Sequence, residues 1–219
     1  MANERYDIPA KLKRACQSGS VALQSFYRNF FVDEMGVLRG EVDLRFLREL
    51  GPDESAVAKD LVRRNLSRGY THIIQCAGDL EDQEAIHQLR AMLANAKDLS
   101  RRLTIAGALW KINRDPCFPG LLAKMIAADD EALKVAHMDQ VLWLGDVRSI
   151  RMLIDLLSDP HRFVRSLALS RLNEAEYGRR FLAEDLPRPA EDYVRSLSDS
   201  VFMEGMVERL NAWRLANLG

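Results

Sequence analysis

Residues 157–172 read LSDPHRFVRSLALSRL, and within them one apolar helix ends and another begins almost at once. Proline lacks a backbone N–H and cannot continue a helix, so Asp159-Pro160 marks the break. The next helix carries four apolar side chains on one face: Val164, Leu167, Ala168 and Leu172. A single helical hairpin cannot bury such a face alone. The stretch therefore predicts a helix pair that stacks against similar pairs.

The same arrangement recurs every 32 residues along the middle of the chain. Apolar positions at i, i+3 and i+7 share one face of each first helix. These positions are Ile86, Phe118 and Ile150; Leu89, Leu121 and Leu153; and Leu93, Met125 and Leu157. In the second helices the recurring positions are Leu103, Val135 and Leu167, and then Ala106, Met138 and Ser170. Internal repeats of this length predict an α-solenoid of stacked antiparallel helix pairs.

The rest of the chain also favours helices. A 3.6-residue periodicity runs through nearly every segment and strand-like alternation is almost absent, so the predicted fold class is all-α. Ser20 and Asp53 are the expected N-caps of two helices. The loop around Gly36 and Gly40 leaves room for a short extended piece. Helices are predicted at 8–17, 20–34, 42–50, 54–66, 69–77, 83–95, 99–112, 118–127, 131–144, 148–157, 162–174, 177–184, 189–197 and 200–216.

Residues 145–168 show a recognisable order of features. Gly145-Asp146 form a turn, a leucine-rich helix follows, Asp159-Pro160 break it, and Val164-Arg165 open the second helix. In this order the segment resembles the short HEAT-like repeats common in bacterial proteins. The resemblance implies an all-α solenoid built from helix pairs. The signature residues of tetratricopeptide and ankyrin repeats, which have similar lengths, are absent.

The resemblance extends over residues 54–174, where Gly78-Asp79 and Asn113-Arg114 stand at the position of the turn. After Leu182 the 32-residue spacing breaks, because Asp185 would fall on the buried stripe. We therefore predict one elongated domain with an N-terminal helical cap at 1–52, HEAT-like repeats at 53–174 and a C-terminal helical cap at 175–219.

The charge balance bears on the kind of partner. The chain of 219 residues has 31 basic and 32 acidic side chains and a formal net charge of −1. Proteins that bind duplex nucleic acid usually carry a net basic surface, so the balance favours a protein partner and makes nucleic acid the less favoured alternative. Cys16, Cys76 and Cys117 form no CxxC pair, which is typical of a reducing compartment. With no signal-like or membrane-spanning apolar run, the expected location is the cytoplasm.

The sequence contains no motif that identifies a chemical reaction. Glu84 and His87 form an ExxH pair, but a di-iron site needs a second such motif, so a solvated pair is the better interpretation. His72 and Cys76 lie at i and i+4, and without two further ligands they are expected to be core residues. The phosphate-binding, dinucleotide-binding and nucleophile-elbow motifs are absent. We therefore predict no catalytic, cofactor-binding or metal-ligating residue.

Several basic residues stand in pairs or recur along the repeats. They are Arg63-Arg64, Arg101-Arg102 and Arg179-Arg180, together with Lys134 and Arg165. One interpretation is a basic strip for an acidic partner or a phosphate backbone. We favour the other, a ladder of ion pairs with Asp79, Asp146 and Asp159, because the charge count is balanced.

The predicted binding surface is the concave face formed by the second helices of a solenoid. Trp110 falls on the buried stripe and is expected in the core, whereas Trp143 stands between core edge and exposed anchor. The residues predicted to contact a partner are Lys111, Asp139, Gln140, Trp143 and Arg171.

The expected function is non-enzymatic binding of a protein partner, for example by an immunity protein that neutralises a toxin or by an adaptor. The alternative is an enzyme of the HEAT-like alkylpurine DNA glycosylase type, for which Trp143 beside Asp139 is the nearest match. Bilin lyases are further relatives of short HEAT repeats, but no residue here supports that activity. A continuous positive groove would favour the glycosylase, and mixed charge would favour a protein partner.

Overall fold

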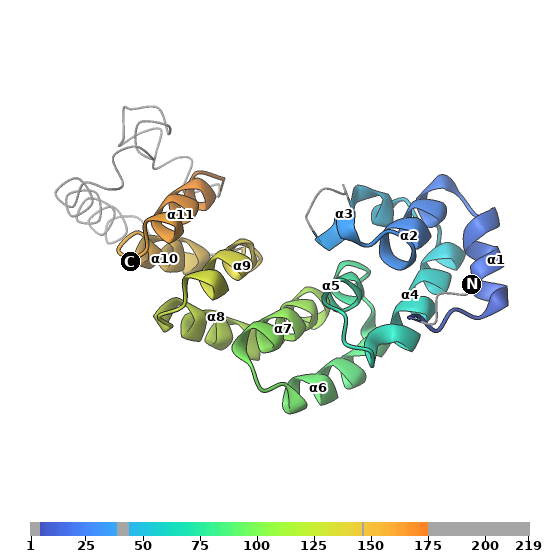
Figure 1. Ribbon diagram of the computed structural model, residues 1–219, viewed down its shortest axis with the longest axis horizontal. Helices are drawn as coiled ribbons and strands as arrows, with labels where there is room; N and C mark the ends of the chain where they lie inside the picture. The colour runs from blue at the N-terminus through green and yellow to red at the C-terminus, as the bar shows by residue number, and fades with distance from the viewer. Residues whose placement is uncertain (1–4, 39–43, 146, 175–219) are drawn as a thin grey trace. The chain divides into compact units, whose positions relative to one another are not determined.

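The prediction of an all-α fold is confirmed. The computed structural model describes residues 5–38, 44–145 and 147–174, and in these ranges it contains helices and no strand (Figure 1). The α-helices are α1 (Ala10–Ser18), α2 (Val21–Phe31), α3 (Met35–Leu38), α4 (Pro52–Leu66), α5 (Thr71–Asp79), α6 (Ile86–Asn95), α7 (Leu99–Asn113), α8 (Cys117–Ala127), α9 (Glu131–Leu142), α10 (Val147–Leu156) and α11 (Arg162–Glu174). Two 3-10 helices are η1 (Leu44–Arg48) and η2 (Gln83–Ala85).

Most predicted helices match these bounds within a few residues, and the differences are local. The segment predicted as a helix at 42–50 forms the 3-10 helix η1, and the one predicted at 20–34 ends at Phe31. The short α3 occupies part of the loop where an extended piece was considered. The three helices predicted beyond residue 176 lie outside the described residues.

The chain divides into two compact units, Met1–Phe118 and Pro119–Gly219. In the first unit α4 pairs with α5, α6 pairs with α7, and α5 packs along α7. In the second unit α10 pairs with α11, and α11 packs against α9. Packed helix pairs of this kind are compatible with a helical repeat. The predicted division into caps and repeats stays a prediction, and the C-terminal cap lies outside the described residues.

Two N-cap predictions have opposite outcomes. Ser20 caps α2, because its hydroxyl accepts a hydrogen bond from the Leu23 N–H at 3.2 Å. The prediction for Asp53 is wrong: α4 begins two residues earlier, with Gly51 as its N-cap and Pro52 as its first residue. Proline is pre-organised for the first helical position, which moves the start of α4 ahead of Asp53.

Glu54 connects the starts of α2 and α4. Its carboxylate accepts hydrogen bonds from the Ser20 N–H at 2.8 Å, from the Ser20 hydroxyl at 2.9 Å and from the Gly51 N–H at 3.4 Å. The bonds from Ser20 hold the pKa of Glu54 below its ordinary value. One carboxylate thus satisfies backbone donors at two helix starts that lie far apart in the sequence.

The second helices α7 and α9 begin at repeated positions. Asp98 caps α7 through the Arg101 N–H at 2.7 Å, and Asp130 caps α9 through the Leu133 N–H at 2.9 Å. The two caps are 32 residues apart in the sequence. Beyond the helix ends, Arg114 and Gly145 have the left-handed φ values of 57° and 67°. That conformation is common where a helix ends, and it is cheaper for glycine than for arginine.

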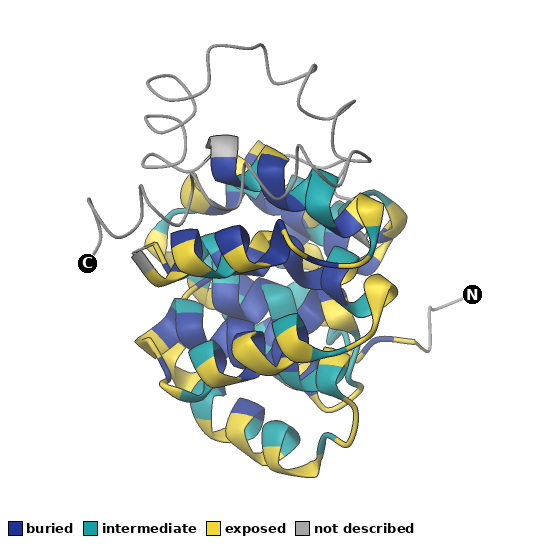
Figure 2. Cartoon of the chain, turned by 90° about the vertical axis from the view of Figure 1, so that its left-hand side faces the viewer, coloured by how far each residue is buried: buried dark blue, intermediate teal, exposed yellow. Residues whose placement is uncertain are grey.

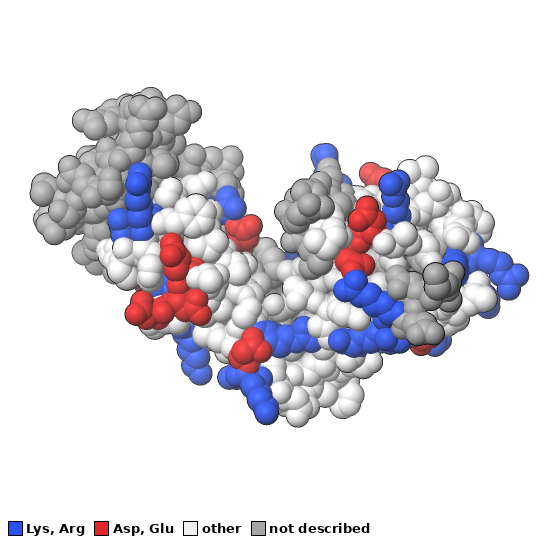
Figure 3. Space-filling view, viewed as in Figure 1, with Lys and Arg blue, Asp and Glu red and all other residues white. Residues whose placement is uncertain are grey.

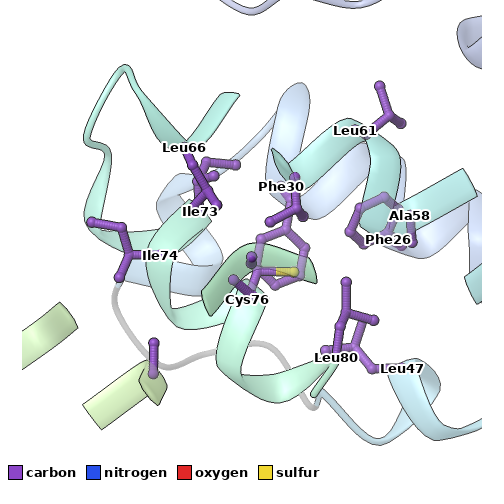
Figure 4. Close-up of a cluster of buried hydrophobic side chains, with 14 of the residues drawn as sticks. Phe26, Phe30, Leu47, Ala58, Leu61, Leu66, Ile73, Ile74, Cys76 and Leu80 are labelled. Atoms are coloured by element: carbon purple, nitrogen blue, oxygen red, sulfur yellow. The ribbon is translucent and has the colours of Figure 1, made fainter. Parts of the chain in front are cut away.

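Side chains of α2, α4 and α5 form much of the core of the first unit. Figure 4 shows Phe30 and Cys76 at its centre, with Ile73 from α5 near them and Leu61 from α4 farther out on the side of Ala58. All five are 1% exposed or less. Figure 2 shows most described helices with a buried side and an exposed side. The exception is α7, whose residues 103–110 are all buried.

The stripe predicted on the first helices is confirmed. Phe118, Leu121, Met125, Ile150, Leu153 and Leu157 are at most 4% exposed, and Leu89 is fully buried; Ile86 and Leu93 are half-buried. The stripe predicted on the second helices is only partly correct. Ala106, Met138 and Leu103 are buried, but Val135 and Leu167 are half-buried and Ser170 is exposed. The apolar face predicted for α11 is buried at Val164, Ala168 and Leu172, and Leu169 is buried in addition, because α11 packs against both α9 and α10.

Gly78 lies where α5 and α7 approach each other closely. A Cβ at this position would lie 2.9 Å from the Ala108 Cα and 3.3 Å from the Ala108 Cβ. We expect Gly78→Ala to lower the free energy of unfolding by about 1–2 kcal/mol, because the cost of overpacking exceeds the gain in helix propensity. Urea denaturation measures this change.

Gly120 supplies the matched control, since it also lies within a helix but a Cβ there would meet nothing within 4 Å. Gly120→Ala should raise stability by about 0.5–1 kcal/mol through propensity alone. An equal increase in the free energy of unfolding for Gly78→Ala and Gly120→Ala would contradict the close packing of α5 on α7.

Candidate partner-binding surface

Lys111, the first of the predicted contact residues, lies near the end of α7 in the first unit. Its ammonium group donates a hydrogen bond to Asp79 Oδ1 at 2.6 Å. Asp79 is the last residue of α5, and the two side chains are each about a quarter exposed. An ion pair between residues 32 apart thus joins two successive second helices.

Asp139 and Arg171 form a second ion pair across 32 residues, in the second unit and at another position of the repeat. The Arg171 Nε donates to Asp139 Oδ1, again across 32 residues, and joins α9 to α11. The Asp139 side chain is 66% exposed, so this pair lies at the surface. Asp139 and Arg171, both predicted to contact a partner, therefore form an ion pair with each other. A negative and a positive charge lie side by side at this surface.

Gln140 corrects the predicted set of contact residues. It is only 4% exposed, and its Nε2 lies 2.9 Å from His137 Nδ1 inside the unit. Adjacent residues of an α-helix point about 100° apart, so the neighbour of the exposed Asp139 turns toward the interior. Gln140 is therefore not available to a partner.

The two tryptophans differ in burial. Trp110 is 6% exposed, its ring centroid is 5.8 Å from that of Phe118, and the Arg114 guanidinium lies 5.2 Å from the Trp110 centroid. The prediction that Trp110 is a core residue is confirmed. Trp143 caps the C-terminal end of α9 and is half-buried. Four residues separate it from Asp139, which places both on one side of α9.

The ladder interpretation is supported at one of its three aspartates, Asp159, which pairs with one of the named basic residues, and otherwise stays a prediction. Lys134 binds Asp159, and both side chains are at most 4% exposed. Arg63 binds Asp82 at 3.3 Å and Glu84 at 2.5 Å. Arg64 binds Asp60 at 3.1 Å. Arg101 and Arg165 instead donate hydrogen bonds to backbone carbonyls, those of Gly69 and, at 2.7 Å, Asp159. Asp146 and Arg179-Arg180 lie outside the described residues.

Figure 3 shows Lys and Arg beside Asp and Glu in several places on this face, and also a short run of adjacent basic side chains. The acidic side chains on this face distinguish it from a uniformly basic surface of the kind that phosphate backbones attract. The described residues on this face therefore provide paired charges of opposite sign.

A buried polar network that the sequence did not reveal surrounds His72. Tyr6 Oη donates to Glu34 Oε2 at 3.0 Å and lies 3.0 Å from His72 Nε2. Arg5 binds Glu34 and lies 4.5 Å above the centroid of the Tyr70 ring. Burial raises the pKa of Tyr6 and lowers that of His72. These residues are distant in the sequence, so spacing offered no signal for the network.

The thiols are poorly suited to nucleophilic chemistry. Burial raises the pKa of Cys16 to about 11 and, with hydrogen bonding to Asp115, that of Cys117 to about 12. Cys76 is fully buried in the core, as expected, and its pKa also rises. The thiolate is the reactive form, and it is disfavoured at all three positions. Among the described residues, no three His, Cys, Asp or Glu side chains lie close enough to hold a metal ion.

A hollow of about 260 Å³ opens beside the Asp79–Lys111 pair. It is lined by Leu44, Arg45, Leu47, Arg48 and Asp79, so it combines apolar walls with charges of both signs. Sequence reasoning missed it because its walls come from η1 and the end of α5, about 30 residues apart.

Of the helices in the described ranges, none combines the length and the apolar character that crossing a bilayer requires.

Comparisons with known proteins identify no relative. No protein family, no curated protein and no solved structure matches this chain.

Proposed function

We propose that this chain is a HEAT-like α-solenoid, capped at residues 1–52 and 175–219, that binds a protein partner in the cytoplasm and performs no catalysis. The observation that carries the proposal is the pair of ion pairs Asp79–Lys111 and Asp139–Arg171, each across 32 residues and each between second helices. Each pair joins equivalent positions of two successive second helices, as stacked copies of one structural unit would. The two pairs stand 60 residues apart, so they occupy different positions of the 32-residue repeat. The surface of the second helices would then serve as the binding face.

The chemistry of this surface supports a protein partner over nucleic acid. Asp139 and Arg171 present both signs of charge, and the half-buried Trp143 lies on the same side of α9. Tryptophan and arginine are enriched among the residues that dominate protein interfaces. A toxin bound by an immunity protein, or an enzyme bound by an adaptor, is the kind of partner that such a surface fits.

The test exchanges the charges of the Asp139–Arg171 pair. We expect Asp139→Arg with Arg171→Asp to leave stability within about 0.5 kcal/mol of the wild type, because the ion pair can form again in reverse. Affinity for the partner should fall at least about tenfold, since the pattern of charge presented to it is inverted. Partners cross-linked in the source cells are identified by mass spectrometry, and the affinity of the purified partner is then measured for each variant.

Lys124 supplies the control, because it is exposed on α8, a first helix of the same unit. Lys124→Glu should leave affinity unchanged. Undiminished binding by the charge-exchanged variant would show that the partner uses another surface. Recovery of nucleic acid as the bound molecule would instead favour the glycosylase alternative.

A further inference from the structure

The segment ahead of α1, residues 5–9, is anchored by a buried aromatic side chain, and we call this segment the strap. Tyr6 of the strap is 5% exposed, and its ring packs edge-on against Phe31 and Tyr70 at centroid distances of 5.2 and 5.5 Å. We propose that the strap is an acid-sensitive latch, which is closed while His72 is neutral and opens when the His72 imidazole takes up a proton.

The hydrogen bonds around Tyr6 determine which nitrogen of His72 carries a hydrogen. Tyr6 Oη lies 3.0 Å from Glu34 Oε2 and 3.0 Å from His72 Nε2. The Glu34 carboxylate is ion-paired with Arg5, so it is ionised and can only accept hydrogen bonds. The single O–H of Tyr6 is therefore donated to Glu34, and His72 Nε2 donates to Tyr6 Oη. This leaves Nδ1 of His72 as the atom that takes up a proton.

The closed strap makes this protonation unfavourable. His72 is 1% exposed, with its ring centroid 6.1 Å from that of Tyr6 and its ring stacked on Tyr70 at 5.8 Å. Burial is the main cause that lowers the pKa of His72, and it outweighs hydrogen bonding with the Phe30 backbone, which favours the charged ring. When the strap leaves, Tyr6 no longer covers His72, so that water can solvate the imidazolium.

The charges that act on His72 come from Glu34 and Arg5, and their effects are opposite. Glu34 raises the pKa of His72 and Arg5 lowers it, and the two side chains approach His72 as an ion pair. Tyr6 and Cys76 are neutral, because burial raises the pKa of each. The helices α3, α4 and α7 also pack against α5; α3 carries no charged residue, and charged side chains of the other two bind elsewhere: Arg63 to Asp82, Arg64 to Asp60, Arg101 to the Gly69 carbonyl and Lys111 to Asp79.

The strap can open without unfolding the helices behind it. Its backbone is bound by Asn65, whose Oδ1 accepts from the Asp7 N–H at 2.7 Å and whose Nδ2 donates to the Asp7 carbonyl at 3.0 Å. Asn65 also donates to the Leu61 carbonyl at 2.8 Å, which holds its side chain on α4 when the strap leaves. The next helix, α1, packs against α2 and α4 through contacts of its own. Opening therefore requires a movement about Pro9 and breaks the contacts of Tyr6 and Asp7.

The direction of the pH effect follows from proton linkage. The closed form has the lowered pKa of His72 and binds fewer protons than the open form, whose imidazole has the ordinary pKa of about 6.5. The closed form is therefore fully stabilised above about pH 6.5, and this stability is lost as pH falls from there toward the folded-state pKa. One proton changes the ratio of closed to open forms by at most about tenfold per pH unit. In acid the chain would thus expose the aromatic slot of Phe31 and Tyr70 that Tyr6 fills near neutral pH.

Hydrogen exchange at the Asp7 amide measures the latch, because this N–H is bonded to Asn65 in the closed form. The experiment follows its protection factor by NMR in the full chain, corrected for the pH dependence of exchange in an unprotected amide. Between about pH 7.5 and pH 5 we expect the factor to fall at least about fivefold in the wild type, while amides of α4 and α5 keep their protection. The midpoint of the His72 titration in the same spectra should lie below about 6.5, and should return to about 6.5 in Tyr6→Ala.

His72→Gln removes the titration but keeps an amide N–H that can donate to Tyr6. The Asp7 protection factor of this variant should stay constant within about twofold over the same pH range. His87→Gln is the matched control, because His87 is exposed on α6 of the same unit. This control should keep the pH dependence of the wild type.

Three results would overturn the latch. An equal fall in protection in His72→Gln and the wild type would assign the pH sensitivity to another group, such as Glu34. Loss of protection in α4 and α5 together with Asp7 would mean that the whole unit unfolds and the strap does not open by itself. A wild-type His72 midpoint at or above about 6.5 would remove the linkage, and this measurement decides the matter even if His72→Gln does not fold.

Discussion

Replacing Asp159 with alanine is expected to lower the free energy of unfolding of the second unit by about 3–5 kcal/mol. The change leaves the ammonium group of Lys134 buried without its partner, since the Lys134 side chain is only 4% exposed. An uncompensated buried charge is among the most costly defects in a folded protein. Asp159 also accepts a hydrogen bond from the His161 N–H at 2.9 Å, so the turn before α11 loses an anchor.

Two further variants separate the buried charge from other effects. Asp129 is exposed, and Asp129→Ala should change stability by less than about 0.5 kcal/mol. Lys134→Met with Asp159→Leu removes both charges, and it should recover much of the loss because apolar pairs of similar size often replace buried ion pairs at little cost. Urea denaturation measures the free energy of unfolding of each variant. A small decrease in Asp159→Ala would show that the Lys134–Asp159 ion pair is not buried in solution.

The pH dependence of stability follows from the same carboxylate. Burial alone would raise the pKa of Asp159, but hydrogen bonds from Lys134 and His161 hold it below its ordinary value of about 3.9. A lowered folded-state pKa contributes stability that is fully present above the unfolded-state pKa and is lost as pH falls through the folded-state pKa. Between pH 5 and pH 2, roughly, stability should therefore fall more steeply in the wild type than in Asp159→Ala.

Phe30→Ala is expected to destabilise the first unit by about 3–5 kcal/mol. Phe30 is 1% exposed, and its ring centroid lies 5.5 Å from that of Phe26 at the centre of the core (Figure 4). Truncation removes the transfer free energy of the ring and leaves a cavity that its neighbours fill only in part. Chemical denaturation measures the loss, and faster amide exchange in α2 would locate it in this unit.

Phe163 offers the same substitution at a surface position, because it is 58% exposed. Phe163→Ala should change stability by less than about 0.5 kcal/mol. Similar losses in the two variants would mean that the core drawn around Phe30 is incorrect.

Local sequence features predicted much of the architecture. The 3.6-residue spacing of apolar residues specified helices, and Pro160 specified where one of them stops. Ser20 was recognisable as a cap because the hydroxyl that accepts the hydrogen bond belongs to the helix start itself. Trp110 and the stripe of the first helices were predicted correctly because a helix can bury only the face that its apolar residues share.

Tertiary contacts decided the remainder, because spacing along one helix does not say which neighbours cover it. The buried face of α11 depends on its packing against α9 and α10, so Ser170 is exposed although the repeat predicted otherwise. Gln140 turns inward beside the exposed Asp139. The hollow at Arg45 and Arg48 exists because Leu47 of η1 packs beside Leu80, a contact between distant segments that no local pattern encodes. The exposure of a side chain depends on which other helices pack against it, whereas the spacing of apolar residues depends on the sequence alone.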